Sequence, residues 1–377
     1  MASVEIEGLT KWYGKRRGVE NISFNLADKE FLTVFGPAGA GKTTTLNLIA
    51  GIVTPNQGSV KIAGCNIDGL EPAERNIAMV FESYALYPQL TVFENMAFPL
   101  RSPKYKQPEK KVKERVVHYA KVMKIDHLLD RQIQALSNGQ RQRTALGRAL
   151  VRQPDVFLFD EPLSHLDAKL RHSMRAELKE MRSQLGTTTI YVTHDYLEAM
   201  SLGDRVAVIN EGRIHHIGTP KEVYFRPTTM EVARLFGDPE INLVMGQLKA
   251  KGLQLVVQIL GENVGIEVPP DAAEPLRTAN KVYVGFRPAD VNVIEGNSKT
   301  ALHGVVYSFE PLGTKSVLTV DAADGTRIRA LIDGRRTIQI DRRIQFTITP
   351  HSLMFFDADT HRFLFRSKVP IEEVANG

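Results

Sequence analysis

The residues best suited to chemistry form a glycine-rich segment between a short apolar run and a helical pattern. Their spacing is GxxxxGK[ST], in which backbone N–H groups can point at phosphate oxygens and the lysine can reach the β- and γ-phosphates. The hydroxyl after the lysine can bind Mg²⁺, and the N-terminus of the following helix adds partial positive charge. We therefore predict a loop that binds nucleotide phosphates, made of Gly36, Pro37, Ala38, Gly39, Ala40, Gly41, Lys42, Thr43 and Thr44.

Two carboxylates and a histidine stand where two later apolar runs end. Asp160 ends the run VFLFD, and Glu161 follows it. A carboxylate at a strand end that faces a phosphate loop suits Mg²⁺, and the adjacent glutamate can act as general base on an attacking water. His194 ends the run TTIYVTH, from which its side chain can reach the γ-phosphate. Because a strand-end histidine is often structural, the residues alone leave the role of His194 open.

The elements that must position these groups alternate between strands and helices. Continuous apolar runs at 31–36, 156–160 and 188–194 are separated by helical patterns, which indicates a parallel sheet covered on both faces. A half-buried strand is expected at 3–10. The stretch from about 88 to 153 is predominantly helical and amphipathic, which is typical of an inserted helical subdomain.

The pattern changes after residue 236. Two short helical patterns occupy 220–236, and short alternating strands broken by Gly, Asp and Asn follow. Such spacing is typical of an all-β barrel or sandwich. We therefore predict an α/β domain over 1–236, with its helical subdomain at about 88–153, followed by an all-β domain over 237–377.

Length and composition limit the class of protein. The chain has 377 residues, which is enough for two or three domains with separate cores. Its single cysteine, Cys65, excludes an internal disulfide and favours a reducing compartment. The first residues lack the basic and apolar regions of a secretory signal, and no run reaches the roughly 18 apolar residues that span a bilayer. These features predict a soluble, cytosolic protein.

The excess of positive charge lies in the first predicted domain. Residues 1–236 carry 32 basic and 26 acidic side chains, whereas residues 237–377 carry 16 and 17. Part of the excess lies at 101–115, which fits a solvated helix face or, alternatively, contact with an anionic membrane surface or an acidic partner. Because only Tyr105 is available there for stacking on bases, we expect no nucleic-acid partner.

A motif at 136–143 points to a family. It reads LSNGQRQR and opens a helical pattern with Ser137, Asn138, Gly139 and Gln140. The motif resembles the LSGGQ signature of ATP-binding-cassette (ABC) transporter ATPases. The resemblance implies a phosphate-loop ABC cassette that binds ATP and Mg²⁺ and hydrolyses ATP. Lys42 and His194 would then stabilise the charge of the transferring phosphoryl group.

The resemblance also implies how ATP is held. Tyr13 matches the aromatic residue that stacks on adenine, while Asp160 and Thr43 would hold Mg²⁺. The segment Ser164-His165-Leu166-Asp167 matches the loop that crosses the interface of a head-to-tail dimer, and His194 matches the family's switch histidine. In that dimer each ATP lies between the phosphate loop of one subunit and the signature residues, Ser137 to Gln140, of the other.

Longer stretches resemble the ATPases of carbohydrate importers of the maltose and glycerol-3-phosphate type. They are MVFESYALYPQLTVFENMAFPL, PLSHLDAKLR, VTHDYLEAM and IGTPKEVYFRP. The tail resembles that group's OB-like C-terminal domain through VYVGFRPADV and LMFFDADTHRFLF. The resemblance implies a peripheral subunit at the cytoplasmic face of the inner (plasma) membrane. Its partners would be a second ATPase subunit, two transmembrane permeases and, indirectly, an extracytoplasmic solute-binding protein.

Two positions depart from the family pattern. Glu82 stands where the family usually has a glutamine that touches Mg²⁺ or the attacking water. A carboxylate there can bind Mg²⁺, but it adds negative charge near Glu161 and the γ-phosphate. Asn138 replaces a glycine of the signature, and asparagine tolerates left-handed backbone better than most residues. Both changes are compatible with retained activity or with a pair of unequal sites formed with a different ATPase.

Several alternatives remain at this point. ATPases for iron or polyamine import share a similar tail, so the solute class stays open, as does the choice between homodimer and heterodimer. A soluble ABC ATPase of DNA repair or translation would require tandem cassettes or coiled-coil inserts, and neither is apparent in the sequence. An OB domain that binds nucleic acid is disfavoured by the near-neutral charge of 237–377.

Overall fold

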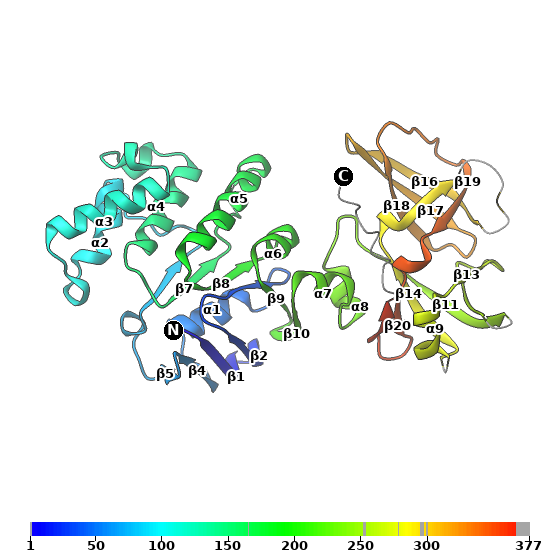
Figure 1. The fold of residues 1–377 in the computed structure, drawn as a ribbon, viewed down its shortest axis with the longest axis horizontal. Helices are drawn as coiled ribbons and strands as arrows, with labels where there is room; N and C mark the ends of the chain where they lie inside the picture. The colour runs from blue at the N-terminus through cyan, green and yellow to red at the C-terminus, as the bar shows by residue number, and fades with distance from the viewer. Residues whose placement is uncertain are drawn as a thin grey trace, which may run out of the picture. The chain divides into compact units, whose positions relative to one another are not determined.

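The structure, a computed structural model, describes residues 2–164, 166–251, 254–277, 279–294, 298 and 301–366. The chain divides into two compact units, Met1–Pro220 and Lys221–Gly377. The first unit combines a mostly parallel sheet, an antiparallel sheet and a group of helices, whereas the second consists mainly of antiparallel strands (Figure 1). The predicted fold class, an α/β cassette followed by an all-β domain, is confirmed.

A six-stranded sheet forms the centre of the first unit. Its strands are ordered β10 (Arg213–Gly218), β9 (Arg205–Asn210), β3 (Phe31–Phe35), β8 (Thr188–Thr193), β7 (Val156–Asp160) and β6 (Ile77–Val80). Neighbouring strands are parallel except for β10 and β9. Every residue of β3, β7 and β8 is buried, which is the condition that continuous apolar runs predict for a parallel sheet. The sequence reading did not identify β6 and β9.

Three helices follow strands of this sheet, α1 (Lys42–Ala50) after β3, α5 (Ala168–Leu185) after β7 and α6 (Tyr196–Leu202) after β8. Gly51 ends α1 with a φ of 78°, and its N–H donates to carbonyls of the last turn. Asp167 and Asp195 cap the N-termini of α5 and α6 through their carboxylates. Asp195 directly follows His194, whereas Asp167 lies seven residues after Asp160.

The strand predicted at 3–10 belongs to a second, antiparallel sheet. The order of its strands is β2 (Arg16–Leu26), β1 (Val4–Tyr13), β4 (Gln57–Ile62) and β5 (Cys65–Asn66). Val4 and Ile6 of β1 share one apolar core with Leu46 and Ile49 of α1. This shared burial holds the β1–β2 hairpin against α1, the helix that follows the glycines of the phosphate loop.

Helices α2 (Val92–Arg101), α3 (Glu109–Val122) and α4 (Asn138–Leu150) lie in the stretch predicted to be helical. Figure 1 shows them grouped together and separate from the antiparallel sheet. Met96, Val116 and Leu146, one from each helix, belong to a single apolar cluster. Short 3₁₀ helices are also present at Pro72–Glu74, Pro103–Tyr105, Asp126–Leu128, Ile133–Ala135, Pro288–Asp290 and Pro350–Ser352.

The second unit is built on two antiparallel sheets. One has the order β13 (Gly265–Glu267), β12 (Gln254–Ile259), β11 (Asn242–Lys251), β14 (Lys281–Phe286), β20 (Met354–Asp357) and β21 (Phe363–Arg366). The other has the order β15 (Val291–Ile294), β19 (Arg343–Ile348), β16 (Leu302–Pro311), β17 (Lys315–Ala322) and β18 (Arg327–Asp333). Helices α7 (Pro220–Phe225), α8 (Met230–Arg234) and α9 (Pro270–Leu276) complete the described part of this unit.

The division between the units falls earlier than the predicted 236/237 boundary. Arg287, only 5% exposed, donates hydrogen bonds to the backbone carbonyls of Tyr224, Ala233 and Phe236. Its guanidinium also stacks over the Tyr224 ring at 4.1 Å from the centroid. The two short helices at 220–236 therefore pack with the β strands that follow them, because a buried arginine from β14's end needs their carbonyls as acceptors.

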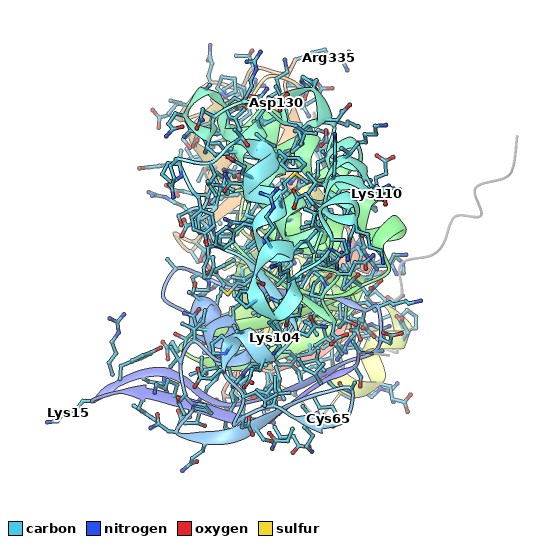
Figure 2. All side chains as sticks on the ribbon, turned by 90° about the vertical axis from the view of Figure 1, so that its left-hand side faces the viewer. Lys15, Cys65, Lys104, Lys110, Asp130 and Arg335 are labelled. Carbon is cyan, nitrogen blue, oxygen red and sulfur yellow. The ribbon has the colours of Figure 1, made fainter. Side chains whose placement is uncertain are left out.

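The single cysteine of the chain is accessible at the surface. Cys65 is a free, exposed cysteine on the short strand β5 (Figure 2). No helix within the described ranges is both long and apolar enough to cross a membrane.

Candidate functional site

The order of the strands explains why the predicted groups can meet. In parallel strands the carboxyl ends lie at one edge of the sheet, which is where α/β proteins bind ligands. The phosphate loop follows β3, His194 follows β8, and the pair Asp160 and Glu161 ends β7, and these three strands are adjacent in the order β3-β8-β7. Glu82 lies two residues beyond the end of β6, which is the neighbour of β7. One edge therefore carries all of these side chains.

The phosphate loop needs glycine at two positions for clear steric reasons. A Cβ on Gly36 would lie 2.0 Å from the backbone oxygen of Ile209, so any side chain there would collide with β9. Gly41 has a φ of 102°, and a Cβ there would lie 2.8 Å from the Gly18 carbonyl oxygen. Between these two positions the crest of the loop, Pro37 to Gly39, is exposed. The loop thus packs tightly at both ends and opens to solvent in the middle.

Lys42 is buried to 5% exposure and is held by three oxygen atoms. Its Nζ donates to the carbonyls of Gly36 at 3.0 Å and Pro37 at 2.9 Å. The same Nζ lies 3.2 Å from Oε1 of Glu161, which makes a partly buried ion pair. A phosphate oxygen entering the loop can replace these partners, because a buried ammonium remains stable only while anions or carbonyls surround it.

Thr43 and Asp160 meet across the site. The Thr43 hydroxyl donates to Oδ1 of Asp160 at 3.0 Å. Burial raises the pKa of the Asp160 carboxyl above its usual value, and the nearby carboxylates of Glu161 and Glu82 raise it further. The Thr43 hydrogen bond and Lys42 act in the opposite direction. This set of hard oxygen donors, crowded with negative charge, fits Mg²⁺.

Glu161 joins the phosphate loop to His194. Its Oε2 lies 2.5 Å from Nδ1 of His194, while its Oε1 contacts Lys42. Glu161 is 18% exposed and His194 is 49% exposed. Glu161 also has a φ of 46°, a left-handed conformation that non-glycine residues rarely adopt and that recurs at functional sites. A carboxylate held between a lysine and a histidine can accept a proton from a water beside the loop.

Glu82 reaches the same edge through Ser164. The Ser164 hydroxyl lies 3.4 Å from Oε1 of Glu82 and donates to the Glu161 carbonyl at 2.9 Å. Ser164 belongs to the segment that resembles the family's interface loop, of which His165 lies outside the described residues. The segment therefore contacts the acidic edge of the site as well as leading into α5.

A cavity of about 470 Å³ lies beside the phosphate loop, a volume typical of small-ligand sites. Tyr13 lines it together with loop residues from Ala38 to Thr44 and Glu161. Tyr13 is 45% exposed, so its side chain is accessible from the cavity.

The cavity also contains residues that the sequence reading did not identify. Arg16, Arg17 and Gly18 line it next to Tyr13. They follow Lys15, which stands at the tip of the β1–β2 hairpin and points away from the body of the protein (Figure 2). The sequence contains a signal for them, because three consecutive basic residues begin two positions after Tyr13, which the family resemblance singles out. Arg17 is paired with Glu20 at 3.2 Å.

The four signature residues form the start of α4 and do not line this cavity. Ser137 is the N-cap, and its hydroxyl accepts from the Gln140 N–H at 3.4 Å while the Gln140 side chain accepts from the Ser137 N–H at 3.0 Å. Ser137 and Asn138 are exposed, whereas Gly139 is buried against Leu170 of α5. Asn138 is accommodated as the first helical residue. Within one chain the signature residues thus stay separate from the phosphate loop.

A strand, a phosphate loop and a helix, together with a strand-end Asp-Glu pair and a serine-capped signature helix, define a nucleotide-binding cassette of the ABC type. Comparison with known proteins agrees with this definition. The profile of the ABC transporter family matches residues 19–164, and that of the TOBE domain matches residues 284–356 in the β unit. The chain belongs to the family of ABC transporter ATP-binding proteins and is an ATPase.

Relatives extend over nearly the whole chain. The sn-glycerol-3-phosphate import ATP-binding protein UgpC of Chromobacterium violaceum is 42% identical over 365 residues, which cover 96% of each chain. The xylose/arabinose import ATP-binding protein XacJ of Haloferax volcanii is 39% identical and covers 96% of this chain and 95% of its own. YurJ of Bacillus subtilis, an uncharacterized ABC transporter ATP-binding protein, is 39% identical and covers 97% and 100%.

Solved structures resemble part of the chain. The structure of cbiO1 from Clostridium perfringens, part of the ABC transporter complex cbiONQ, has a TM-score of 0.54 and 30% identity. It covers 58% of this chain and 89% of its own. An ATP-binding cassette solved as a dimer in a post-hydrolysis state with ADP and Pi has a TM-score of 0.52 and 29% identity, and covers 58% and 98%. The similarity to this dimer concerns the fold of one subunit.

Proposed function

We propose that this protein is the ATP-hydrolysing subunit of an importer for a carbohydrate or a related polyol or glycerol phosphate. The contact chain from Lys42 through Glu161 to His194 supports hydrolysis, because it places a base and two cationic or hydrogen-bonding groups beside the phosphate loop. The class of solute follows from relatives of nearly full length, whose names specify import of sn-glycerol-3-phosphate and of xylose and arabinose.

In this proposal each group at the sheet edge has a defined task. Glu161 accepts the proton of the attacking water, and Lys42 leaves Glu161 for the β- and γ-phosphate oxygens when ATP enters. His194 donates a ring N–H to the γ-phosphate. Tyr13 stacks on adenine at the open end of the cavity, where its ring is exposed.

Mg²⁺ would be held by Thr43 and Asp160, with Glu82 as an additional carboxylate, and it would supply charge neutralisation for the phosphates. The hydroxyl of Thr43 and the carboxylate of Asp160 are already within hydrogen-bond distance, so the oxygen donors converge. Because Asp160 is buried, its carboxylate is shielded from water, and its negative charge would interact strongly with Mg²⁺.

The proposed working unit contains two cassettes arranged head to tail. Ser137 to Gln140 of one cassette would meet the ATP held by the phosphate loop of the other, since an exposed helix N-terminus with small residues suits phosphate. Two transmembrane permeases would carry the solute, supplied by an extracytoplasmic binding protein. The subunit would then act at the cytoplasmic face of the plasma membrane.

The assignment is tested by uptake and by co-purification. A strain that lacks this chain should lose uptake of sn-glycerol-3-phosphate, a pentose or an oligosaccharide, and wild-type chain should restore it while Glu161→Gln should not. Permeases should co-purify with the chain from membranes. Loss of iron or polyamine uptake with all carbohydrate uptake intact would overturn the solute class. Unchanged uptake of every solute, with no membrane partner recovered, would overturn the transport role.

A further inference from the structure

Arg171, in the first turn of α5, connects two loops of the site without lining the nucleotide cavity. Its Nη2 donates to the carbonyls of Ser164 at 3.3 Å and Leu166 at 3.1 Å. Its Nη1 lies 3.5 Å from Oδ2 of Asp195, the residue after His194. One planar guanidinium therefore links the turn that follows Glu161 to the turn that carries His194.

The turn that carries His194 is held together by a network of hydrogen bonds. The Thr193 hydroxyl donates to the carboxylate of Glu198 at 2.7 Å and accepts from the Asp195 N–H at 2.9 Å. The Tyr191 hydroxyl donates to the same Glu198 oxygen at 2.9 Å. Glu198 is 3% exposed, so these hydrogen bonds are shielded from water. Thr193 and Asp195, which flank His194 in the chain, both belong to this network. A displacement of Asp195 would therefore also displace His194.

The turn on the glutamate side is tied to the acidic edge. Ser164, whose carbonyl accepts from Arg171, donates its hydroxyl to the backbone carbonyl of Glu161 at 2.9 Å. The Glu161 N–H in turn donates to the carbonyl of Val192 on β8 at 3.1 Å. Arg171 is thus placed to set the separation of the two turns whose side chains meet at 2.5 Å between Glu161 and His194.

We propose that Arg171 is a positioning residue for ATP hydrolysis, which holds the Ser164 turn and Asp195 together and thereby keeps His194 in register with Glu161. The inference rests on the proposed roles of Glu161 and His194. A guanidinium suits this task because it can donate to carbonyls and to a carboxylate from one rigid plane, which a lysine cannot do. Arg171 acts through these residues and does not contact ATP.

The test compares two arginines of α5 in the full-length protein. Arg171→Gln should lower kcat for ATP by about 10- to 100-fold, the effect of a small misplacement of reacting groups, while KM for ATP changes little. Arg175→Gln removes the same charge one turn later, where Nη2 lies 3.2 Å from Nδ1 of His172, and it should keep the wild-type kcat. If Arg171→Gln proves unstable, Arg171→Lys keeps the charge and should still show the fall in kcat.

A double-mutant cycle tests whether Arg171 positions His194 through its ion pair with Asp195. Asp195→Asn keeps an oxygen for the α6 cap, which accepts from the Leu197 N–H at 2.8 Å, but weakens the pair with Arg171. The double variant should be no slower than the slower single variant, because both changes break one connection. Falls in kcat that multiply would overturn the linkage.

The remaining outcomes separate this inference from the proposed function. Hydrolysis by the wild type that Glu161→Gln abolishes and that Arg171→Gln leaves unchanged would overturn the inference alone. A rise in KM at constant kcat would also overturn it, because it would place Arg171 in nucleotide binding. A wild-type protein that does not hydrolyse ATP would overturn the proposed function together with the inference.

Discussion

The phosphate-loop edge and the signature segment differ in how their polar groups are satisfied. At the sheet edge, Glu161 contacts both Lys42 and His194, and each of the three residues is brought there by a different strand. At the start of α4, Ser137 and Gln140 satisfy each other's backbone N–H groups in a capping box and remain accessible to solvent. The first region is assembled by long-range contacts, whereas the second is a local helix cap.

This difference shows which half of the proposed ATP site a single chain can build. The groups proposed to be catalytic are preorganised by the parallel sheet, so their geometry exists before a partner binds. The signature has its helix N-terminus ready but lacks contact with the phosphate loop of its own chain within the described residues. Variants in the two regions should therefore fail in different assays, hydrolysis for the first and ATP-dependent association for the second.

The largest effect is expected at the sheet edge. Glu161→Gln removes the base but keeps the size of the side chain, and it should lower kcat by about 10²–10⁴-fold, the usual contribution of general base catalysis. ATP should still bind, so an ATP-bound dimer should accumulate and be visible by size-exclusion chromatography. Glu180→Gln, the same substitution at an exposed residue of α5, is the matched control. Wild-type turnover in Glu161→Gln would remove Glu161 from this role.

The signature should respond mainly in association. Ser137→Asp keeps an N-cap but adds a negative charge where the partner's phosphates are proposed to bind, so ATP-dependent dimerisation in the Glu161→Gln background should weaken about 10- to 100-fold. Ser137→Asn, which also caps a helix without adding charge, is the control. Binding of ATP to the single chain should be unchanged, as measured by nucleotide fluorescence. Loss of that binding would place Ser137 in the site of its own chain.

The smallest effect is expected for Glu82→Gln, which restores the usual family residue. Glu82 is one of the causes, after burial and Glu161, that raise the pKa of Asp160. Removing its charge should lower that pKa, so the Asp160 carboxylate should persist to lower pH. The acidic limb of the kcat/KM profile should move to lower pH by less than about one unit. Identical pH profiles and identical Mg²⁺ dependence in both proteins would show that Glu82 does not influence the site.

Much of the site could be predicted from short motifs. The phosphate loop, Asp160 and Glu161 are indicated by residue types at fixed spacing, because strand-to-loop chemistry is local in sequence, whereas the signature is identified by its resemblance to a family motif. The cassette followed by an all-β domain was also predictable, since the period of apolar residues changes after residue 236. Arg16, Arg17 and Gly18 were missed because the hairpin's approach to the loop is a tertiary contact.

Other errors and omissions have similar physical causes. The short run IAMV at β6 and the run RVAVIN at β9 were not identified as strands, although β6 brings Glu82 to the edge. The two short helices at 220–236 were assigned to the cassette because the alternating strand pattern begins only after residue 236. Their carbonyls are instead the acceptors of Arg287, a residue more than fifty positions later in the chain. Only long-range packing could reveal that partner.

The sequence by itself determined the chemistry of this protein, since glycine, lysine, threonine and carboxylates at these spacings have few uses other than binding and hydrolysing a nucleotide. The tertiary structure decided which of these groups act together. Strand order brought Glu161 and His194 to the edge that carries the phosphate loop, and Arg171 joined two turns that are separate in sequence. Motifs are set by local backbone geometry, whereas the alignment of strand ends depends on burial across the whole sheet.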